Sequence, residues 1–292
     1  MGIIIDGKKV SEQILNELKN KTAKLLADKG IVPGLAVLLV GNDPASESYV
    51  NSKEKACREI GYKSVFVRLP EEATQNDILK IVKEWNEDKS IHGILVQLPL
   101  PKHIDENKVI LSIKPSKDVD GFHPENFGRL VIGLPGFVPC TPAGIMELLK
   151  RYEIQTSGKH VVVVGRSNIV GKPVANLLYQ KNSGANAVVT ICHTGAKDIQ
   201  YYTMQADILI AAMGVPLAIK AGDVKENVVI IDVGINRIED IAAPKGYRLV
   251  GDVDFENVKD KAYAITPVPG GVGKMTIAML MLSTFKAANG EI

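Results

Sequence analysis

A lysine stands out in the segment that follows Asp43-Pro44, a pair that predicts a helix start with Asp as N-cap and Pro at the first helical position. On a helical wheel of about 100° per residue, Lys53 falls in the middle of the apolar face. Burial of an ammonium group is costly and lowers its pKa, so such a lysine can exchange a proton near neutral pH. Tyr49 lies one turn earlier on the same face, where both side chains can address one substrate atom. The structural alternative is a snorkelling lysine with its head in water.

Two other segments offer polar partners for this lysine. Gly93–Pro101 indicates a buried strand that ends in Gln97, and ligands of open parallel sheets lie outside the carboxyl ends of strands. A neutral amide there can hold the lysine head without adding charge, although a glutamine satisfied by backbone is the alternative. Asp118 and Asp120 lie in a loop closed by Gly121. Their carboxylates either cap a turn or grip a ligand with adjacent N–H donors, such as an aminopyrimidine ring.

The segment Lys159–Pro173 predicts a strand, a tight glycine turn and a helix. Its spacing resembles the dinucleotide fingerprint G-x-G-x-x-G, but Ser167 replaces the second glycine and Gly171 comes one position late. The helix N-terminus offers backbone N–H groups to a phosphate. Arg166 lies in the turn and favours a 2′-phosphate, and the next strand ends without the Asp or Glu that often holds the ribose of NAD. NADP is therefore the expected cofactor, with NAD as the alternative.

The remaining candidates for the cofactor site follow the ends of predicted strands, where the chain can approach a ligand closely. His193 either lines this site or is a plain strand-end histidine, and the glycines either admit the cofactor or are ordinary turn residues. The candidate residues beside Arg166, Ser167 and Gly171 are Gly165, Ile169, His193, Thr194, Gly214 and Ile235.

These residues need a frame of strands and helices. Seven apolar, β-branched segments predict buried strands, at residues 35–40, 65–69, 91–98, 161–164, 187–192, 208–212 and 228–233. Amphipathic segments between them predict helices, at residues 11–27, 47–60, 76–86, 142–150 and 173–180. This alternation predicts an α/β fold with parallel sheets that are covered by helices on both faces.

The length of 292 residues favours two domains. Clusters of Pro and Gly at 135–142 and 266–273 mark the boundaries. The apolar helix expected at 275–288 cannot bury itself alone, so we expect it to pack back on the first domain. The prediction is an N-terminal parallel-sheet α/β domain of residues 1–139 plus 275–292 and a Rossmann-like dinucleotide-binding domain of residues 140–274.

Composition excludes several classes of protein. A hydrophobic fraction of 46% is ample for two cores, and a net charge of +2 gives no global attraction to nucleic acid or anionic membrane. Three distant cysteines, Cys57, Cys140 and Cys192, predict neither a disulfide framework nor a zinc site, and two carboxylates without histidines predict no metal. The N-terminus lacks the features of a signal peptide, and the apolar stretch at 276–285 is too short to span a bilayer. We therefore expect a cytoplasmic protein with reduced thiols.

Six separate motifs, in this order and over essentially the whole chain, resemble the bifunctional methylenetetrahydrofolate dehydrogenase/cyclohydrolase family. They are Tyr49–Lys53, Gly93–Pro101, Lys117–Gly121, Pro139–Pro142, Gly165–Pro173 and Pro267–Gly273. The resemblance implies oxidation of 5,10-methylenetetrahydrofolate to the methenyl compound with reduction of NAD(P). It further implies hydrolysis to 10-formyltetrahydrofolate, and a homodimer that acts in one-carbon folate metabolism.

The same resemblance assigns roles to residues. It implies that Lys53 is the catalytic lysine, that Tyr49 stacks on or orients the folate, and that Gln97 tunes the lysine. It further implies that Asp120 grips the pterin. The residues expected to border the folate cleft are Pro267, Gly270 and Gly271. The domain of residues 1–139 plus 275–292 is then the folate-binding catalytic domain.

The sequence departs from the family pattern at two places. Lys274 stands where the family usually has proline, and Thr194 follows Cys192-His193 where a Ser and a cation are common, so that the next cation is Lys197. The second departure leaves open whether the cofactor is NADP or NAD. Three alternatives remain: a dehydrogenase of the same architecture that acts on another substrate, a folate-binding relative without turnover, and an enzyme that retains only one of the two activities.

Overall fold

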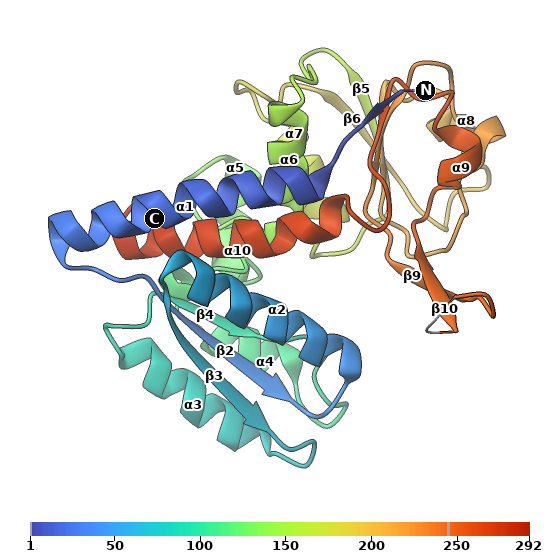
Figure 1. The fold of residues 1–292 in the computed structure, drawn as a ribbon. Coiled ribbons are helices and arrows are strands. Elements are labelled where there is room, and N and C mark those ends of the chain that lie inside the picture. The colour runs from blue at the N-terminus through green and yellow to red at the C-terminus, as the bar shows by residue number, and fades with distance from the viewer. Residues whose placement is uncertain (1, 244–245) are drawn as a thin grey trace. The chain divides into compact units, whose positions relative to one another are not determined.

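The computed structural model describes residues 2–243 and 246–292, which form two compact units, each with its own parallel sheet (Figure 1). The first, called here the three-strand unit, comprises Glu12–Cys140 and Ile277–Ile292. The second, the six-strand unit, comprises the chain up to Ser11 and Thr141–Thr276. The predicted α/β class with a Rossmann-like second domain is confirmed.

The sheet of the three-strand unit has the parallel order β3-β2-β4, formed by β3 (Lys63–Leu69), β2 (Gly34–Val40) and β4 (Gly93–Val96). Every residue of the central strand β2 is buried, as expected for a parallel strand that is covered on both faces. Ala36, Leu38 and Val40 point to one face and pack with apolar residues of α3 (Gln75–Glu87) and α4 (Glu106–Ser112).

Helix α2 (Pro44–Ile60) begins and ends as its sequence predicts. The side chain of Asp43 accepts a 2.7 Å hydrogen bond from the Ser46 N–H, and Pro44 occupies the first turn. Gly61, with φ +80°, ends the helix in the left-handed conformation. These caps fix the register of α2 and hence the face on which Lys53 lies.

The C-terminal helix α10 (Val272–Asn289) continues into the three-strand unit, which confirms that it packs back on the first domain. The Tyr62 hydroxyl donates to the Met281 carbonyl at 2.9 Å, and Thr284 lies against Gly93 of β4. Helix α1 (Gly7–Lys29) runs beside α10, where Lys29 Nζ donates to Asn289 Oδ1 at 2.7 Å (Figure 1). The unit also contains the 3-10 helix η1 (Pro115–Lys117) and α5 (Pro124–Ile132).

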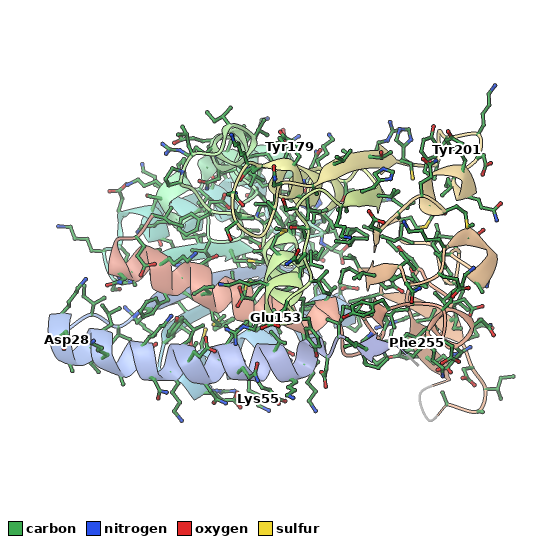
Figure 2. The ribbon with its side chains drawn as sticks, turned by 90° about the horizontal axis from the view of Figure 1, so that it is seen from above. Asp28, Lys55, Glu153, Tyr179, Tyr201 and Phe255 are labelled. Atoms are coloured by element: carbon green, nitrogen blue, oxygen red, sulfur yellow. The ribbon has the colours of Figure 1, made fainter. Side chains whose placement is uncertain are left out.

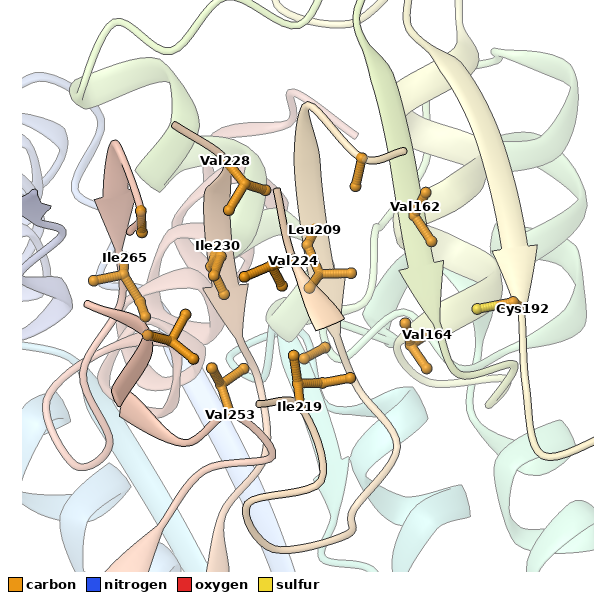
Figure 3. Packing of buried hydrophobic residues seen from close by; sticks show 14 residues of the cluster. Val162, Val164, Cys192, Leu209, Ile219, Val224, Val228, Ile230, Val253 and Ile265 are labelled. Atoms are coloured by element: carbon orange, nitrogen blue, oxygen red, sulfur yellow. The ribbon is translucent and has the colours of Figure 1, made fainter. Parts of the chain in front are cut away.

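The six-strand unit has the all-parallel order β1-β11-β8-β7-β5-β6. Its strands are β1 (Ile3–Ile4), β5 (His160–Val164), β6 (Val188–Cys192), β7 (Ile208–Ala211), β8 (Val229–Asp232) and β11 (Ala264–Ile265). Its other elements are α6 (Cys140–Arg151), α7 (Gly171–Tyr179), α8 (Gln200–Thr203), the 3-10 helix η2 (Ala221–Asp223), α9 (Phe255–Val258) and the antiparallel pair β9 (Asn236–Glu239) and β10 (Tyr247–Val250). Side chains from β5, β7 and β8 form one continuous apolar core (Figure 3).

The strand order of this unit locates a ligand site. The chain leaves β5 toward β6 on one side and returns to place β7 on the other side of β5. In open parallel sheets, ligands bind outside the carboxyl ends of the strands at such a reversal. The turns that follow β5 and β7 are therefore the expected walls of a cofactor site.

The expected domain boundary is wrong at the N-terminus. Residues up to Ser11 belong to the six-strand unit because β1 pairs with β11, with Ile3 opposite Ala264 and Ile4 opposite Ile265. A strand of two residues carries no periodicity that sequence analysis can detect. In the part of the chain that the structure describes, no helix has the length and apolarity to cross a membrane.

Candidate functional site

Lys53 is buried in the three-strand unit, with only 6% of its surface exposed. Its Nζ atom donates to Oε1 of Gln97 at 2.8 Å. Lys55 lies on the same helix but has a side chain that is 71% exposed (Figure 2). The helical wheel thus distinguishes the two lysines correctly, and the snorkelling alternative for Lys53 is wrong.

Gln97 follows the end of β4 and is held in one orientation. Its backbone N–H donates to the Leu38 carbonyl at 2.8 Å, and its side-chain Nε2 donates to the Leu98 carbonyl at 2.7 Å. Because the nitrogen faces a carbonyl, the amide oxygen must face Lys53. Lys53 therefore meets a neutral acceptor at the carboxyl edge of the sheet.

Asp120 completes the charge environment of the lysine. Burial lowers the pKa of Lys53, and the negative charge of Asp120 opposes this change. Burial likewise raises the pKa of Asp120, against the effect of Lys53. Cys140 is 1% exposed and lies close to both groups, and burial raises the pKa of its thiol well above the usual value. Desolvation therefore favours a neutral amine beside a protonated thiol.

Asp118 has a different role from Asp120. It is 2% exposed, and its carboxylate accepts hydrogen bonds from the N–H groups of Phe122 (3.2 Å) and His123 (2.8 Å) and from Nδ2 of Asn126 (2.8 Å). Burial raises its pKa to about 6 although these bonds oppose the change. Of the two predicted alternatives for this loop, Asp118 takes the turn-capping one, and a ligand grip by Asp120 stays a prediction.

Tyr49 lies one helical turn before Lys53 and is 39% exposed. Burial of part of the side chain raises the pKa of its hydroxyl, so the phenol stays protonated at neutral pH. A half-accessible aromatic ring next to the lysine provides a surface on which a flat heterocycle can stack.

The predicted nucleotide turn lies at the carboxyl end of β5. Gly165 has φ +133°, and a Cβ there would lie 2.2 Å from the Ala212 carbonyl oxygen. A Cβ on Gly171 would lie 2.3 Å from the Gly165 carbonyl oxygen. Ser167 Oγ accepts hydrogen bonds from the N–H groups of Val170 (3.1 Å) and Gly171 (3.3 Å), so the hydroxyl closes the turn where a second glycine is usual. The backbone packing explains both glycines and fits a close approach by a phosphate.

The other predicted cofactor residues follow neighbouring strands of the same sheet and therefore share its carboxyl edge. Arg166 and Thr194 are exposed, and Ile169 and Ile235 are each 46% exposed. His193 follows β6, where its Nδ1 accepts from the Gly195 N–H at 3.0 Å, so it also stabilises its own turn. Gly214, with φ +67°, follows β7.

Pro267, Gly270 and Gly271 follow β11 and lie in the six-strand unit, whereas Lys53, Gln97 and Asp120 lie in the three-strand unit. Gly270 has φ +111°, and a Cβ on Gly271 would lie 2.6 Å from the Pro267 carbonyl oxygen. The glycines are thus required by the packing of their own loop. Whether they also border a folate stays a prediction.

Three side chains are not singled out by the sequence. It predicts Cys140 only as a plain buried thiol, yet this thiol lies beside Asp120. Asp232 and Asp252 are 3% and 0% exposed, and both accept hydrogen bonds from backbone N–H groups in the turns of the six-strand unit. A signal was present in the sequence, because each aspartate is embedded in an apolar run, Ile230-Ile231-Asp232-Val233 and Val250-Gly251-Asp252-Val253.

Comparisons with known proteins identify relatives over the whole chain. Residues 5–120 match the family described as tetrahydrofolate dehydrogenase/cyclohydrolase, catalytic domain, and residues 139–292 match its NAD(P)-binding domain. The bifunctional protein FolD of Chlorobium phaeobacteroides is 58% identical over 286 residues, which cover 97% of each chain. The crystal structure of the bifunctional methylenetetrahydrofolate dehydrogenase/cyclohydrolase FolD from Campylobacter jejuni has a TM-score of 0.93 and 51% identity, with all of both chains covered. The Trypanosoma brucei enzyme, solved with NADP and an inhibitor, has a TM-score of 0.93 and 39% identity, with 99% of this chain and 98% of that chain covered.

Proposed function

Because the chain belongs to the tetrahydrofolate dehydrogenase/cyclohydrolase family, we propose that Lys53, held by Gln97, is the acid–base group of its folate site. The chain is a bifunctional enzyme of one-carbon folate metabolism. It oxidises 5,10-methylenetetrahydrofolate to 5,10-methenyltetrahydrofolate with reduction of NAD(P), and it hydrolyses the methenyl compound to 10-formyltetrahydrofolate.

One observation carries the proposal for Lys53: a buried amine that faces a neutral amide. Loss of a hydride from the bridging carbon creates a cation, so a permanent ammonium charge beside it is unfavourable. Desolvation lowers the pKa of Lys53, and Gln97 adds no negative charge that would restore it. The amine therefore gives up its proton more readily than an exposed lysine and can act as a base.

The hydrolytic step then balances in protons and bonds. Water adds its oxygen to the methenyl carbon while one of its protons passes to the Lys53 amine. The bond between that carbon and one ring nitrogen then breaks, and this nitrogen receives the proton of the resulting ammonium. The hydroxyl on the carbon releases its remaining proton to solvent as the formyl C=O forms, so one proton is set free for each cation consumed. Lys53 returns to its neutral form, and the product is 10-formyltetrahydrofolate.

The neighbours of Lys53 provide a folate site with distinct roles. Asp120 is half-buried beside the lysine, and its carboxyl group can accept hydrogen bonds from the amino and ring N–H groups of a pterin. The accessible ring of Tyr49 suits stacking on the same heterocycle. We assign Pro267, Gly270 and Gly271 to the border of the folate site, by analogy with the family pattern. On this proposal the three-strand unit is the folate-binding catalytic domain.

The six-strand unit is then the dinucleotide-binding domain. The cofactor, when bound, supplies the acceptor for the hydride. Its phosphates fit the close backbone turn at Gly165 and Gly171, at the N-terminus of the nine-residue helix α7. Arg166 is exposed in that turn, which favours the 2′-phosphate of NADP over NAD. The other proposed cofactor residues are Ser167, Ile169, His193, Thr194, Gly214 and Ile235.

A second copy of this chain is the proposed protein partner. Strand β6 is an edge strand of the sheet, and Val188 and Ile191 on it are 64% and 43% exposed. Tyr179, at the end of α7, is 48% exposed (Figure 2). An apolar edge strand is a template for pairing with another chain. We infer a homodimer through β6; Val188→Lys should convert it to a monomer in sedimentation experiments, and an unchanged dimer would exclude this edge.

The remaining inferences concern location and other partners. Cys57, Cys140 and Cys192 are all buried free thiols, which fits the reducing cytoplasm. A net charge of +2 provides no general attraction to nucleic acid.

A coupled assay tests the proposal as a whole. The purified protein is incubated with 5,10-methylenetetrahydrofolate and either NADP or NAD, and nicotinamide reduction is followed by absorbance. We expect turnover with NADP that exceeds turnover with NAD. A second assay follows loss of the methenyl compound without nucleotide. Activity on an unrelated alcohol substrate and none on the folate would support the rival dehydrogenase, and nucleotide-free binding of folate without turnover would support the non-catalytic relative.

A further inference from the structure

Asp252 is a fully buried carboxylate in the six-strand unit with no role in the chemistry described above. Its Oδ2 atom accepts hydrogen bonds from the backbone N–H groups of Met213 (2.7 Å) and Gly214 (2.9 Å), which follow β7. Its Oδ1 atom accepts from the side-chain Nδ2 of Asn236 at 2.9 Å, and Asn236 closes the turn after β8. One carboxylate therefore connects the turns at the carboxyl ends of two adjacent strands.

The segment that carries Asp252 is itself fixed to the core. Val253 is 1% exposed and forms an isolated parallel bridge with Ile219 (Figure 3). The Ile219 N–H donates to the Asp252 carbonyl at 2.9 Å. Asp232, at the end of β8, accepts from the N–H groups of Asp252 (3.0 Å) and Val253 (2.9 Å) and from Gly234 (3.0 Å). The position of the Asp252 carboxylate is thus determined by the hydrophobic core and by a second carboxylate.

Two glycines show how closely the backbone packs on these carboxylates. A Cβ on Gly234 would lie 2.2 Å from Oδ1 of Asp252, and a Cβ on Gly251 would lie 1.8 Å from Oδ2 of Asp232. No side chain fits at either position without displacement of a carboxylate. The backbone of the β8 turn therefore rests directly on Asp252.

We propose that Asp252 is a positioning residue for the nucleotide reaction, because its bonds to Gly214 and Asn236 fix the spacing of the two turns that flank the cofactor. This inference rests on the proposed function, which assigns Gly214 and Ile235 to the cofactor. Ile235 lies between Gly234 and Asn236, both of which contact Asp252. Hydride transfer requires the reacting atoms to be held within a fraction of an ångström, and a small displacement of either turn is costly. Hydrolysis of the methenyl compound uses no nucleotide and does not depend on this spacing.

The variant Asp252→Asn tests the inference, with Asp254→Asn as matched control. An amide cannot accept on both sides, so either the Met213 and Gly214 N–H groups or Asn236 loses its acceptor. Asp254 lies two residues away, and its carboxylate bonds Asn257 and Lys220 outside the turns. We expect Asp252→Asn to raise the KM for NADP by about 10- to 100-fold and to lower the dehydrogenase kcat. Nucleotide-free cyclohydrolase activity should stay within about twofold of the wild type for both variants.

Several outcomes would overturn the inference. The first is an unchanged KM for NADP in folded Asp252→Asn. The second is a variant in which both activities and the melting temperature fall together, because this result indicates a structural role only. If Asp252→Asn does not fold, Asn236→Ala decides, because it removes a single bond: an increased KM for NADP supports the inference and an unchanged value overturns it. Binding of NADP is also titrated directly by calorimetry. A wild type that binds NADP but does not oxidise the folate would contradict the proposed function, while the effect of Asp252→Asn on binding would still decide this inference.

Discussion

The Lys53 amine and the Gln97 amide form a 2.8 Å hydrogen bond between a titratable donor and a neutral acceptor. Because Gln97 also donates to the Leu98 carbonyl, the polarity of this bond cannot reverse by rotation of the amide. The lysine is thereby oriented without a counter-charge on that side. Burial lowers the pKa of Lys53, and the negative charge of the Asp120 carboxylate opposes this change.

The first prediction concerns Lys53 itself. Lys53→Met removes the proton acceptor but keeps an unbranched apolar stem, so the cyclohydrolase rate should fall by about 10²- to 10⁴-fold while the protein stays folded. Lys55→Met, on the exposed side of the same helix, is the control and should retain both activities. The rate of methenyl loss and the circular dichroism spectrum are the measurements. Wild-type hydrolysis by Lys53→Met would exclude the proposed role.

The second prediction concerns the charge at position 97. Gln97→Glu places a carboxylate 2.8 Å from the amine and stabilises the ammonium form, so the pKa of Lys53 rises. The base is then present only at higher pH, and the ascending limb of the cyclohydrolase pH profile should move to higher pH. Gln97→Met removes the acceptor without adding charge and should lower the rate without that alkaline displacement. Identical pH profiles for Gln97→Glu and the wild type would show that the lysine does not act as the base.

The third prediction separates two neighbouring aspartates. Asp118→Asn replaces one acceptor oxygen by an NH2 donor, which faces either the Phe122 N–H or the His123 N–H and the Asn126 amide. This change should lower the free energy of unfolding by about 1–3 kcal/mol, with little change in the KM for folate. Asp120→Asn should raise that KM by about tenfold, with little change in stability. Thermal melting and steady-state kinetics on both variants check this. The reverse pattern would exchange the roles of the two residues.

Much of the site could be predicted because its signals are local. Helical periodicity depends only on residues of α2 and predicts the buried position of Lys53, and the end of one apolar strand predicts the place of Gln97. The order of strand, turn and helix predicts the turn at Gly165. Gln97 lies one residue beyond β4 rather than inside a longer strand, but its predicted place at the carboxyl edge of the sheet is correct.

The features that sequence analysis does not predict depend on contacts between distant parts of the chain. Strand β1 exists only because Ile3 meets Ala264, and Asp252 acquires its partners only when residues 213 and 236 fold next to it. Helices α4 and α5 and strand β9, with seven, nine and four residues, are too short for periodicity to show them. Sequence alone also gave no reason to place Cys140 beside Asp120.

The fourth prediction follows from the burial of Asp232. Burial raises its pKa from the usual 3.8 to about 7. Because the folded-state pKa is raised, the stabilising contribution of the protonated carboxyl is complete below about pH 4 and is lost as the pH rises to about 7. The free energy of unfolding of the wild type relative to Asp232→Asn should therefore fall across this range, by up to about 4 kcal/mol.

Urea denaturation at a series of pH values measures this difference. The amide also replaces one of the two acceptor oxygens, so either the N–H groups of Gly234 and Asp252 or that of Val253 lose their acceptor. This loss adds a constant offset to the free energy of unfolding but no slope with pH. Asp254→Asn is the control, because the Asp254 pKa is lowered and its contribution changes only at more acidic pH. A difference between wild type and Asp232→Asn that stays constant from pH about 4 to about 8 would contradict the prediction.

The fifth prediction concerns the choice between NADP and NAD. The two dinucleotides differ by one phosphate on the ribose, so the loss of a residue that binds this phosphate should change the KM for NADP and not the KM for NAD. Arg166 is exposed in the turn after β5, and its guanidinium can bind a phosphate with two parallel hydrogen bonds. Arg166→Gln should raise the KM for NADP by about 10- to 100-fold, which corresponds to a loss of about 1.4–2.8 kcal/mol, and leave the KM for NAD unchanged. Lys197→Gln tests the next cation after β6 in the same way, and an effect on NADP confined to this second variant would assign the phosphate grip to Lys197 instead.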